Sequence, residues 1–265
     1  MLRLLRIAVV LALTALAADP GAAKDFKIFS GEPRLLVVHG YSTSFHWWAM
    51  LQRKIDRFRP GERKIEVSLA AKGGTPIAKW MDVDTGKPLA PWGEVVVPAL
   101  RKKGARPAVV LAQQSLQWVY GDRDLGIAGS HDAKRIEAGA DAIEKYVRLL
   151  QKDGADQVFV AMHIYKKPLE PEIGNERLAL DEALGRGIAR FHTGPDVWEP
   201  TSKLWPQAFA DDKVHPNSIG AEVMAQLWFE TLLEHDGAEV PAWSRREMES
   251  AIESEPLDLP RGRPR

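Results

Sequence analysis

Short runs rich in apolar and β-branched residues recur along the chain, separated by longer amphipathic segments. Four such runs lie at residues 34–39, 65–69, 107–112 and 157–162. Runs in which apolar residues predominate are typical of strands buried on both faces, as in a parallel sheet whose connections are helices. A short fifth strand is expected from Pro195 to Trp198. We therefore predict an α/β fold, a three-layer α/β/α sandwich around a mainly parallel, flavodoxin-like sheet of about five strands.

Helices are predicted between and after these strands. The apolar residues from Ile136 to Leu150 repeat at helical spacing, as do those from Ile219 to about Leu233. A third helix is expected from about Asn175 to Gly185. With 265 residues, one α/β domain with additional end segments is favoured over two domains.

The two ends of the chain differ from its middle. Residues 1–23 combine a basic start, an apolar run from Ile7 to Ala18 and small residues at the exit, which together predict a secretory signal peptide. The mature protein is then expected to be secreted or periplasmic, with no stable membrane span after cleavage. Residues 24–236 would form the folded domain. The polar segment 237–265 is expected to be a disordered tail.

The amino-acid composition excludes several kinds of functional site. The formal net charge is +0, so there is no electrostatic reason to propose nucleic acid as a partner. The chain has no cysteine, which excludes disulfides, a cysteine nucleophile and thiolate metal ligands. Its histidines show no metal-binding spacing, so neither a metal nor a cofactor is predicted.

The stretch from Asp211 to Gly220 carries the clearest chemical signal. An acid three residues before a histidine can orient the imidazole and leave its other nitrogen free to take a proton. Asp212 and His215 are therefore a candidate orienting acid and base. Asp and Asn near a proline are also common at helix starts, so helix capping is the competing interpretation until a nucleophile is found.

A candidate nucleophile follows the first strand. Gly40-Tyr41-Ser42 comes directly after the apolar run and just before a segment with helical spacing. Ser42 would then lie at the carboxyl end of a strand and near a helix N-terminus, which favours developing negative charge.

Possible oxyanion donors follow the next two strands. Gly73 or Gly74 could present a backbone N–H to a ligand, although a tight turn would explain the pair as well. Gln114 ends the third strand and could donate its amide, as could the N–H of Ser42 itself.

These motifs resemble those of the SGNH (GDSL-like) hydrolases. Asp212-x-x-His215-Pro216-Asn217-x-x-Gly220 is similar to the last signature block of that family, in which Asp and His complete a Ser-His-Asp triad. The resemblance implies Ser42 as nucleophile. The chain departs from the family pattern at Tyr41, where Asp or Asn is usual, and at Gln114, which stands in place of an Asn.

The resemblance predicts a secreted, metal-independent serine hydrolase of the esterase type, acting on an O-acylated carbohydrate or a lipid-like ester. Two alternatives remain open. In an α/β-hydrolase, His39-Gly40 would form the oxyanion loop and Ser115 would be the nucleophile, although the glycines expected around it are missing. In a non-catalytic carbohydrate-binding domain, Trp47 and Trp48 would stack on sugars.

Overall fold

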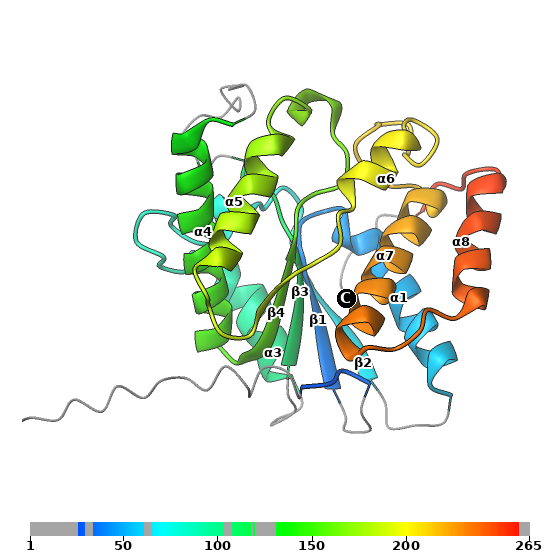
Figure 1. The fold of residues 1–265 in the computed structure, drawn as a ribbon, viewed down its shortest axis with the longest axis horizontal. Coiled ribbons are helices and arrows are strands. Elements are labelled where there is room, and N and C mark those ends of the chain that lie inside the picture. The colour runs from blue at the N-terminus through cyan, green and yellow to red at the C-terminus, as the bar shows by residue number, and fades with distance from the viewer. Residues whose placement is uncertain are drawn as a thin grey trace, which may run out of the picture.

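The computed structural model describes residues 26–29, 34–60, 65–102, 108–117, 119 and 131–259 (Figure 1). Five parallel strands form one sheet in the order β2-β1-β3-β4-β5. The strands are β1 (Arg34–Gly40), β2 (Ile65–Ala71), β3 (Ala108–Gln113), β4 (Ala155–Ala161) and β5 (Phe191–Thr193). This order is the flavodoxin-like one, and it reverses direction between β1 and β3, where ligands are expected at the carboxyl ends of the strands.

The fifth strand lies four residues before its predicted position. Pro195 cannot donate a backbone hydrogen bond, and the Asp196 carboxylate accepts from the N–H groups of Trp198 and Glu199 in the first turn of the next helix. The strand itself is three residues long and partly polar, because β5 is an edge strand that pairs only with β4. The prediction for Pro195 to Trp198 is therefore wrong, whereas the predicted number of strands is confirmed.

Helices cover both faces of the sheet, which confirms the predicted three-layer fold. Figure 1 shows α4 and α5 on one side and α1, α7 and α8 on the other. The longer helices are α1 (Ser44–Phe58), α4 (Ala133–Lys152), α5 (Ile173–Gly185), α7 (Ser218–Asp236) and α8 (Ala242–Glu253). The shorter ones are α2 (Ile77–Trp80), η1 (Trp92–Val96), α3 (Val97–Arg101), η2 (Lys167–Leu169) and α6 (Trp198–Lys203).

Helices α1 and α7 pack together through two tryptophans. The rings of Trp47 and Trp228 stack with centroids 5.6 Å apart and an interplanar angle of 10°, and both side chains are fully buried. Burial of such large apolar surfaces contributes strongly to stability. The contact holds α1, which begins just after Ser42, against α7, which begins just after His215.

The polar C-terminal segment contains a helix where a disordered tail was expected. Helix α8 packs on α7, with Trp243 beside Phe229 and Ser244 accepting a hydrogen bond from Gln226. Only one face of this largely polar helix packs on α7, through a few apolar and small residues. Its other face is exposed to solvent, which suits its polar side chains. The prediction of disorder is wrong for residues 242–253, and residues 260–265 lie outside the described part of the chain.

The N-terminal segment is tied to the end of α7. The carboxylate of Asp236 accepts from the N–H groups of Ile28 and Phe29, at 2.8 and 2.6 Å. The predicted signal peptide, residues 1–23, lies outside the described residues. Within the described ranges, no helix is long and apolar enough to cross a membrane.

Candidate functional site

The turn after β1 presents Ser42 at the start of α1. A Cβ atom at Gly40 would lie 2.4 Å from Ser44 Oγ and 2.5 Å from the carbonyl oxygen of Gln113, so this position has room only for glycine. The N–H of Ser44 then donates to the carbonyl of Tyr41 at 3.0 Å, which closes the turn. Ser42 is thereby held at the carboxyl end of the strand and beside a helix N-terminus.

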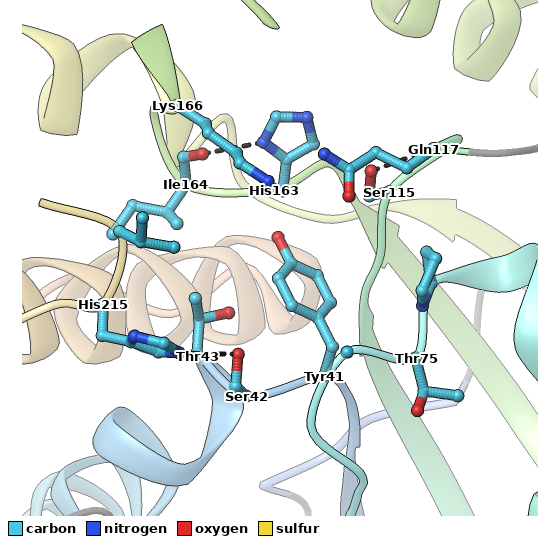
Figure 2. A pocket seen from close by; sticks show the side chains of 13 residues that line it. Tyr41, Ser42, Thr43, Thr75, Ser115, Gln117, His163, Ile164, Lys166 and His215 are labelled. Atoms are coloured by element: carbon cyan, nitrogen blue, oxygen red, sulfur yellow. Dashed lines mark hydrogen bonds between the residues drawn. The ribbon is translucent and has the colours of Figure 1, made fainter. Parts of the chain in front are cut away.

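The structure brings Ser42, His215 and Asp212 together, although Ser42 and His215 are 173 residues apart in sequence. The Ser42 hydroxyl lies 2.8 Å from His215 Nε2, and His215 Nδ1 lies 2.7 Å from Asp212 Oδ2 (Figure 2). Because Nδ1 faces a carboxylate, it carries the ring proton, and Nε2 is left to accept from the serine.

Asp212 is held by the same loop that it orients. Its Oδ1 atom accepts from the N–H groups of Val214 at 3.0 Å and His215 at 2.9 Å. Partial burial acts to raise its pKa, but the hydrogen bonds from His215 and Val214 outweigh that effect and hold the pKa at about 2. Lys213, between them, has a φ of 54°, a left-handed conformation that bends the loop tightly.

The loop that carries Asp212 and His215, here called the histidine loop, is anchored by two further residues of the motif that runs from Asp212 to Gly220. Asn217 caps α7 by accepting from Ile219 and Gly220, and its amide donates to the carbonyls of Gln207 and Phe209. Gly220 allows α7 to approach the preceding loop, since a Cβ there would lie 2.2 Å from the carbonyl oxygen of Ala208. The sequence showed these residues only as parts of a motif, without these structural roles.

A pocket of about 440 Å³ opens beside Ser42 and His215. Its walls come from the loops after β1, β2, β3 and β4 and from the histidine loop. The lining residues include Tyr41, Thr43, Gly74, Thr75, Ser115, Gln117, His163, Ile164, Lys166 and Val214. The site therefore lies at the strands' carboxyl ends, as expected for an open parallel sheet.

Two residues that line the pocket, Ser42 and Gly74, have backbone N–H groups that could act as donors. Gly74 lines the pocket and has a φ of 65°, which favours glycine, whereas Gly73 is not among the lining residues. In the described part of the chain, neither the Ser42 N–H nor the Gly74 N–H has a hydrogen-bond acceptor. Both are therefore available to a bound oxygen atom.

Gln114 does not reach the pocket. It is fully buried, and its amide donates to the phenol oxygen of Tyr146 at 2.9 Å, on the face of the sheet that α4 covers. Burial raises the pKa of Tyr146, so the phenol stays protonated, while the hydrogen bond from Gln114 acts in the opposite direction. The predicted oxyanion role of Gln114 does not fit this arrangement. The side chains of this loop that line the pocket belong to Ser115 and Gln117.

The residues required by the α/β-hydrolase alternative do not meet. Ser115 Oγ accepts from the N–H of Gln117 at 3.1 Å, and Figure 2 places it beyond the Tyr41 ring from Ser42 and His215. His39 is fully buried within the sheet and donates through Nδ1 to the carbonyl of Ala70 at 2.6 Å. Among the described residues, none offers Ser115 a base of the kind that His215 offers to Ser42.

The proposed sugar-stacking pair does not form a platform either. Trp47 is fully buried against Trp228, and Trp48 is half-buried and packs against the core. This specific basis for a carbohydrate-binding surface is therefore removed.

The wall opposite Ser42 carries ionisable residues that the sequence did not single out as a site. His163 Nδ1 donates to the carbonyl of Ile164 at 2.8 Å, and its Nε2 lies 3.2 Å from a carboxylate oxygen of Glu176. Lys166 follows in the same loop and lines the pocket. Burial, and secondly the charge of Glu176, raise the pKa of Tyr41, whose hydroxyl points towards this wall in Figure 2.

The described residues do not form a metal centre. No group of three or more His, Asp or Glu side chains among them is arranged to hold a metal ion. The ionisable groups of the pocket instead pair with one another or face the cavity.

Comparison with known proteins gives a likeness in fold. No family model matches the chain, and no curated protein matches it. The structure of TesA is 16% identical, with a TM-score of 0.51, and the match covers 76% of this chain and 99% of TesA. A mutant of Axe2, an acetyl-xylooligosaccharide esterase from Geobacillus, is 17% identical with a TM-score of 0.52, covering 78% of this chain and 96% of Axe2.

Another Axe2 mutant, described as an acetylxylan esterase from Geobacillus stearothermophilus, gives a similar result. It is 19% identical, with a TM-score of 0.50, over 81% of this chain and 98% of that one. At this level of identity the comparisons bear on the fold, and they agree with the three-layer architecture that the sequence predicts.

Proposed function

We propose that the protein is a serine esterase in which Ser42 is the nucleophile, His215 the general base and Asp212 the orienting acid. The observation that carries the proposal is the continuous chain of hydrogen bonds from Ser42 through His215 to Asp212, at 2.8 and 2.7 Å, at the edge of a pocket. A serine hydroxyl is a weak nucleophile unless a neighbouring base takes its proton, and this arrangement supplies one.

The reaction would proceed through an acyl-enzyme. Ser42 Oγ attacks the ester carbonyl while its proton passes to His215 Nε2, and Asp212 stabilises the imidazolium. His215 then gives that proton to the leaving alcohol as the C–O bond breaks. Water attacks the acyl-enzyme in the second half, its proton again taken by His215 and returned to Ser42.

The N–H groups of Ser42 and Gly74 are the donors that we assign to the developing oxyanion. Both lack an acceptor in the described chain, and both belong to residues that line the pocket. Fixed donors of this kind stabilise the transition state without reorganising during the reaction. Gly73 is a less suitable donor because it does not line the pocket.

The substrate class that we favour is an acylated carbohydrate, with a lipid-like ester as the alternative. The fold likeness to Axe2, an acetyl-xylooligosaccharide esterase, supports the first. The leader-like residues 1–23 support export from the cytoplasm.

A substrate panel tests the proposal. Purified protein is assayed with 4-nitrophenyl esters of graded chain length and with acetylated mono- and oligosaccharides, beside the Ser42→Ala variant. We expect turnover of short acyl esters by the wild type and loss of that turnover in Ser42→Ala with an unchanged circular dichroism spectrum. Undiminished hydrolysis by folded Ser42→Ala, or no turnover of any ester by the wild type, would contradict the proposal.

A further inference from the structure

Three lysines gather where the loop after β4 meets the loop that carries His215. Lys166 is half-buried in the pocket wall. Lys167 and Lys213 lie over the ring of Trp205, with their Nζ atoms 5.1 and 5.9 Å from its centroid. The aromatic ring attracts both ammonium groups to one place although like charges repel.

None of these three lysines has an ion-pair partner within 4.0 Å among the described residues. Glu176 is the acid whose charge acts on Lys166, and its carboxylate lies beside His163. Asp212 is engaged by His215. The positive charge of this corner is therefore not neutralised by direct contacts.

Lys166 is the member of the group that lines the pocket. Figure 2 shows its side chain entering the pocket on the side opposite Ser42 and His215. Burial lowers the pKa of Lys166, and the charge of Glu176 acts against that shift. An incoming anion would compensate for the water that this ammonium has lost, which makes anion binding here more favourable than at a fully solvated lysine.

A second donor lies on the same wall. Gln117 lines the pocket, and in the described chain its side-chain amide forms no hydrogen bond. Figure 2 places that amide on the same side of the Tyr41 ring as His163. An ammonium and an amide N–H are donors that suit the two oxygens of a carboxylate.

We propose that the substrate is an ester that also carries a carboxylate, which binds at Lys166 and Gln117 while the ester group lies at Ser42. Lys167 and Lys213 attract the anion towards the pocket mouth. This inference rests on the proposed esterase function and specifies its substrate class. The carboxylate can belong to the alcohol half, as in an acylated sugar acid, or to the acyl half, as in a dicarboxylic monoester.

Matched ester pairs test the inference. The alcohol half is compared with 4-acetoxybenzoate and 4-acetoxybenzamide, and the acyl half with the 4-nitrophenyl monoester of adipic acid and 4-nitrophenyl hexanoate. Each kcat/KM is divided by the alkaline hydrolysis rate of that ester. For one of the two pairs we expect the anionic ester to be preferred about tenfold or more, the size of one charged hydrogen bond. That pair identifies the half that carries the carboxylate.

Lysine variants locate the effect. Lys166→Gln is expected to lower kcat/KM for the preferred anionic ester about tenfold and for its neutral partner less than twofold. Lys152→Gln, at an exposed lysine near the end of α4, changes net charge equally and should leave the preference unchanged. Equal hydrolysis of both pairs would overturn the inference, as would a parallel loss for both esters in Lys166→Gln.

Binding separates failure of the inference from failure of the esterase proposal. Calorimetric titration measures binding without turnover. The wild type is titrated with 4-hydroxybenzoate and 4-hydroxybenzamide, and separately with adipate and hexanamide. For the half of the substrate that carries the carboxylate, we expect the carboxylate ligand to bind more tightly than its neutral partner. Lys166→Gln and added salt should both weaken that binding. Turnover of neutral esters without any carboxylate preference would leave the esterase proposal standing and refute this one.

Discussion

Asp212 contacts His215 twice, accepting from its ring through Oδ2 and from its backbone N–H through Oδ1. The carboxylate therefore fixes both the path of the loop and the tautomer of the imidazole. Asp211 precedes it, is exposed and forms no such pair with His215. This difference between adjacent acids provides an internal control for the proposed mechanism.

We expect Asp212→Ala to lower kcat by about 10³–10⁴-fold, because the base loses its orientation and the charge that stabilises the imidazolium. His215→Ala should be at least as severe, since it removes the base itself. Asp211→Ala should change kcat less than about twofold. Steady-state kinetics with a 4-nitrophenyl ester measures all three, and the reverse ranking of the two aspartates would show that the orienting acid was assigned incorrectly.

The second prediction concerns which serine reacts covalently. A serine activated by a neighbouring base reacts with a fluorophosphonate, whereas an ordinary serine does not. Peptide mapping should find the adduct on Ser42, and Ser42→Ala should abolish labelling while Ser115→Ala retains it. An adduct on Ser115 would instead support the α/β-hydrolase assignment.

Gln114→Ala should act mainly on stability. The change leaves a buried cavity and removes the donor to the Tyr146 phenol, which predicts a loss of about 2–4 kcal/mol in the free energy of unfolding. Denaturant unfolding measures this loss, and the turnover rate of the folded fraction should fall less than about tenfold. If the rate instead falls by about 10²–10³-fold while stability is unchanged, the oxyanion role would be restored.

His39 predicts a pH dependence of stability. Burial lowers its pKa from 6.5 to about 4, and the hydrogen bond to Ala70 acts against that shift. Between these values the unfolded chain binds more protons than the folded one, so stability falls as the pH drops from about 6.5 towards 4. The contribution of this residue is about 3 kcal/mol between pH 7 and pH 4.

His39→Gln should flatten that part of the curve, measured by urea unfolding at a series of pH values. His192, whose pKa is also lowered to about 4, by burial and by His235, titrates in the same window, so some slope should remain. An unchanged slope in His39→Gln would show that His39 does not cause the pH dependence.

Gly220→Ala tests the packing beneath the histidine loop. The added Cβ would meet the Ala208 carbonyl at 2.2 Å, so we expect a loss of about 1–3 kcal/mol in stability. Gly185→Ala is the matched change at the end of α5, where a Cβ would meet nothing within 4 Å. Thermal unfolding should separate the two, and equal melting temperatures would contradict the predicted contact.

The sequence was most informative where one local pattern decides the structure. β1 to β4 are short, largely buried runs in which apolar and β-branched residues predominate, a pattern that indicates strands of a buried parallel sheet. β5 has no such run because it is a short edge strand, and its position depends on pairing with β4. Helix α8 was missed for a related reason, since its stability comes from contact with α7 more than from its own pattern.

The site divides in the same way. Asp212 and His215 stand three residues apart in one local motif, and the resemblance to SGNH hydrolases implied that Ser42 would be their partner. The place of Gln114 could not be predicted, because the direction of its side chain depends on Tyr146, a partner on α4. The proximity of Lys166 and Glu176 could not be predicted either. Lys166 lies in the loop after β4 and Glu176 on α5, and no short sequence motif contains both.

The 173-residue separation between Ser42 and His215 has a consequence for how the chain matures. Contacts between distant segments form only after the entropy of closing the intervening loop has been overcome. Four strands and most of the helices lie between these two residues, so the serine remains without its base until the last third of the chain has docked. Reaction of Ser42 with a fluorophosphonate would therefore indicate that folding is complete. A partly synthesised chain that lacks His215 would not react at Ser42.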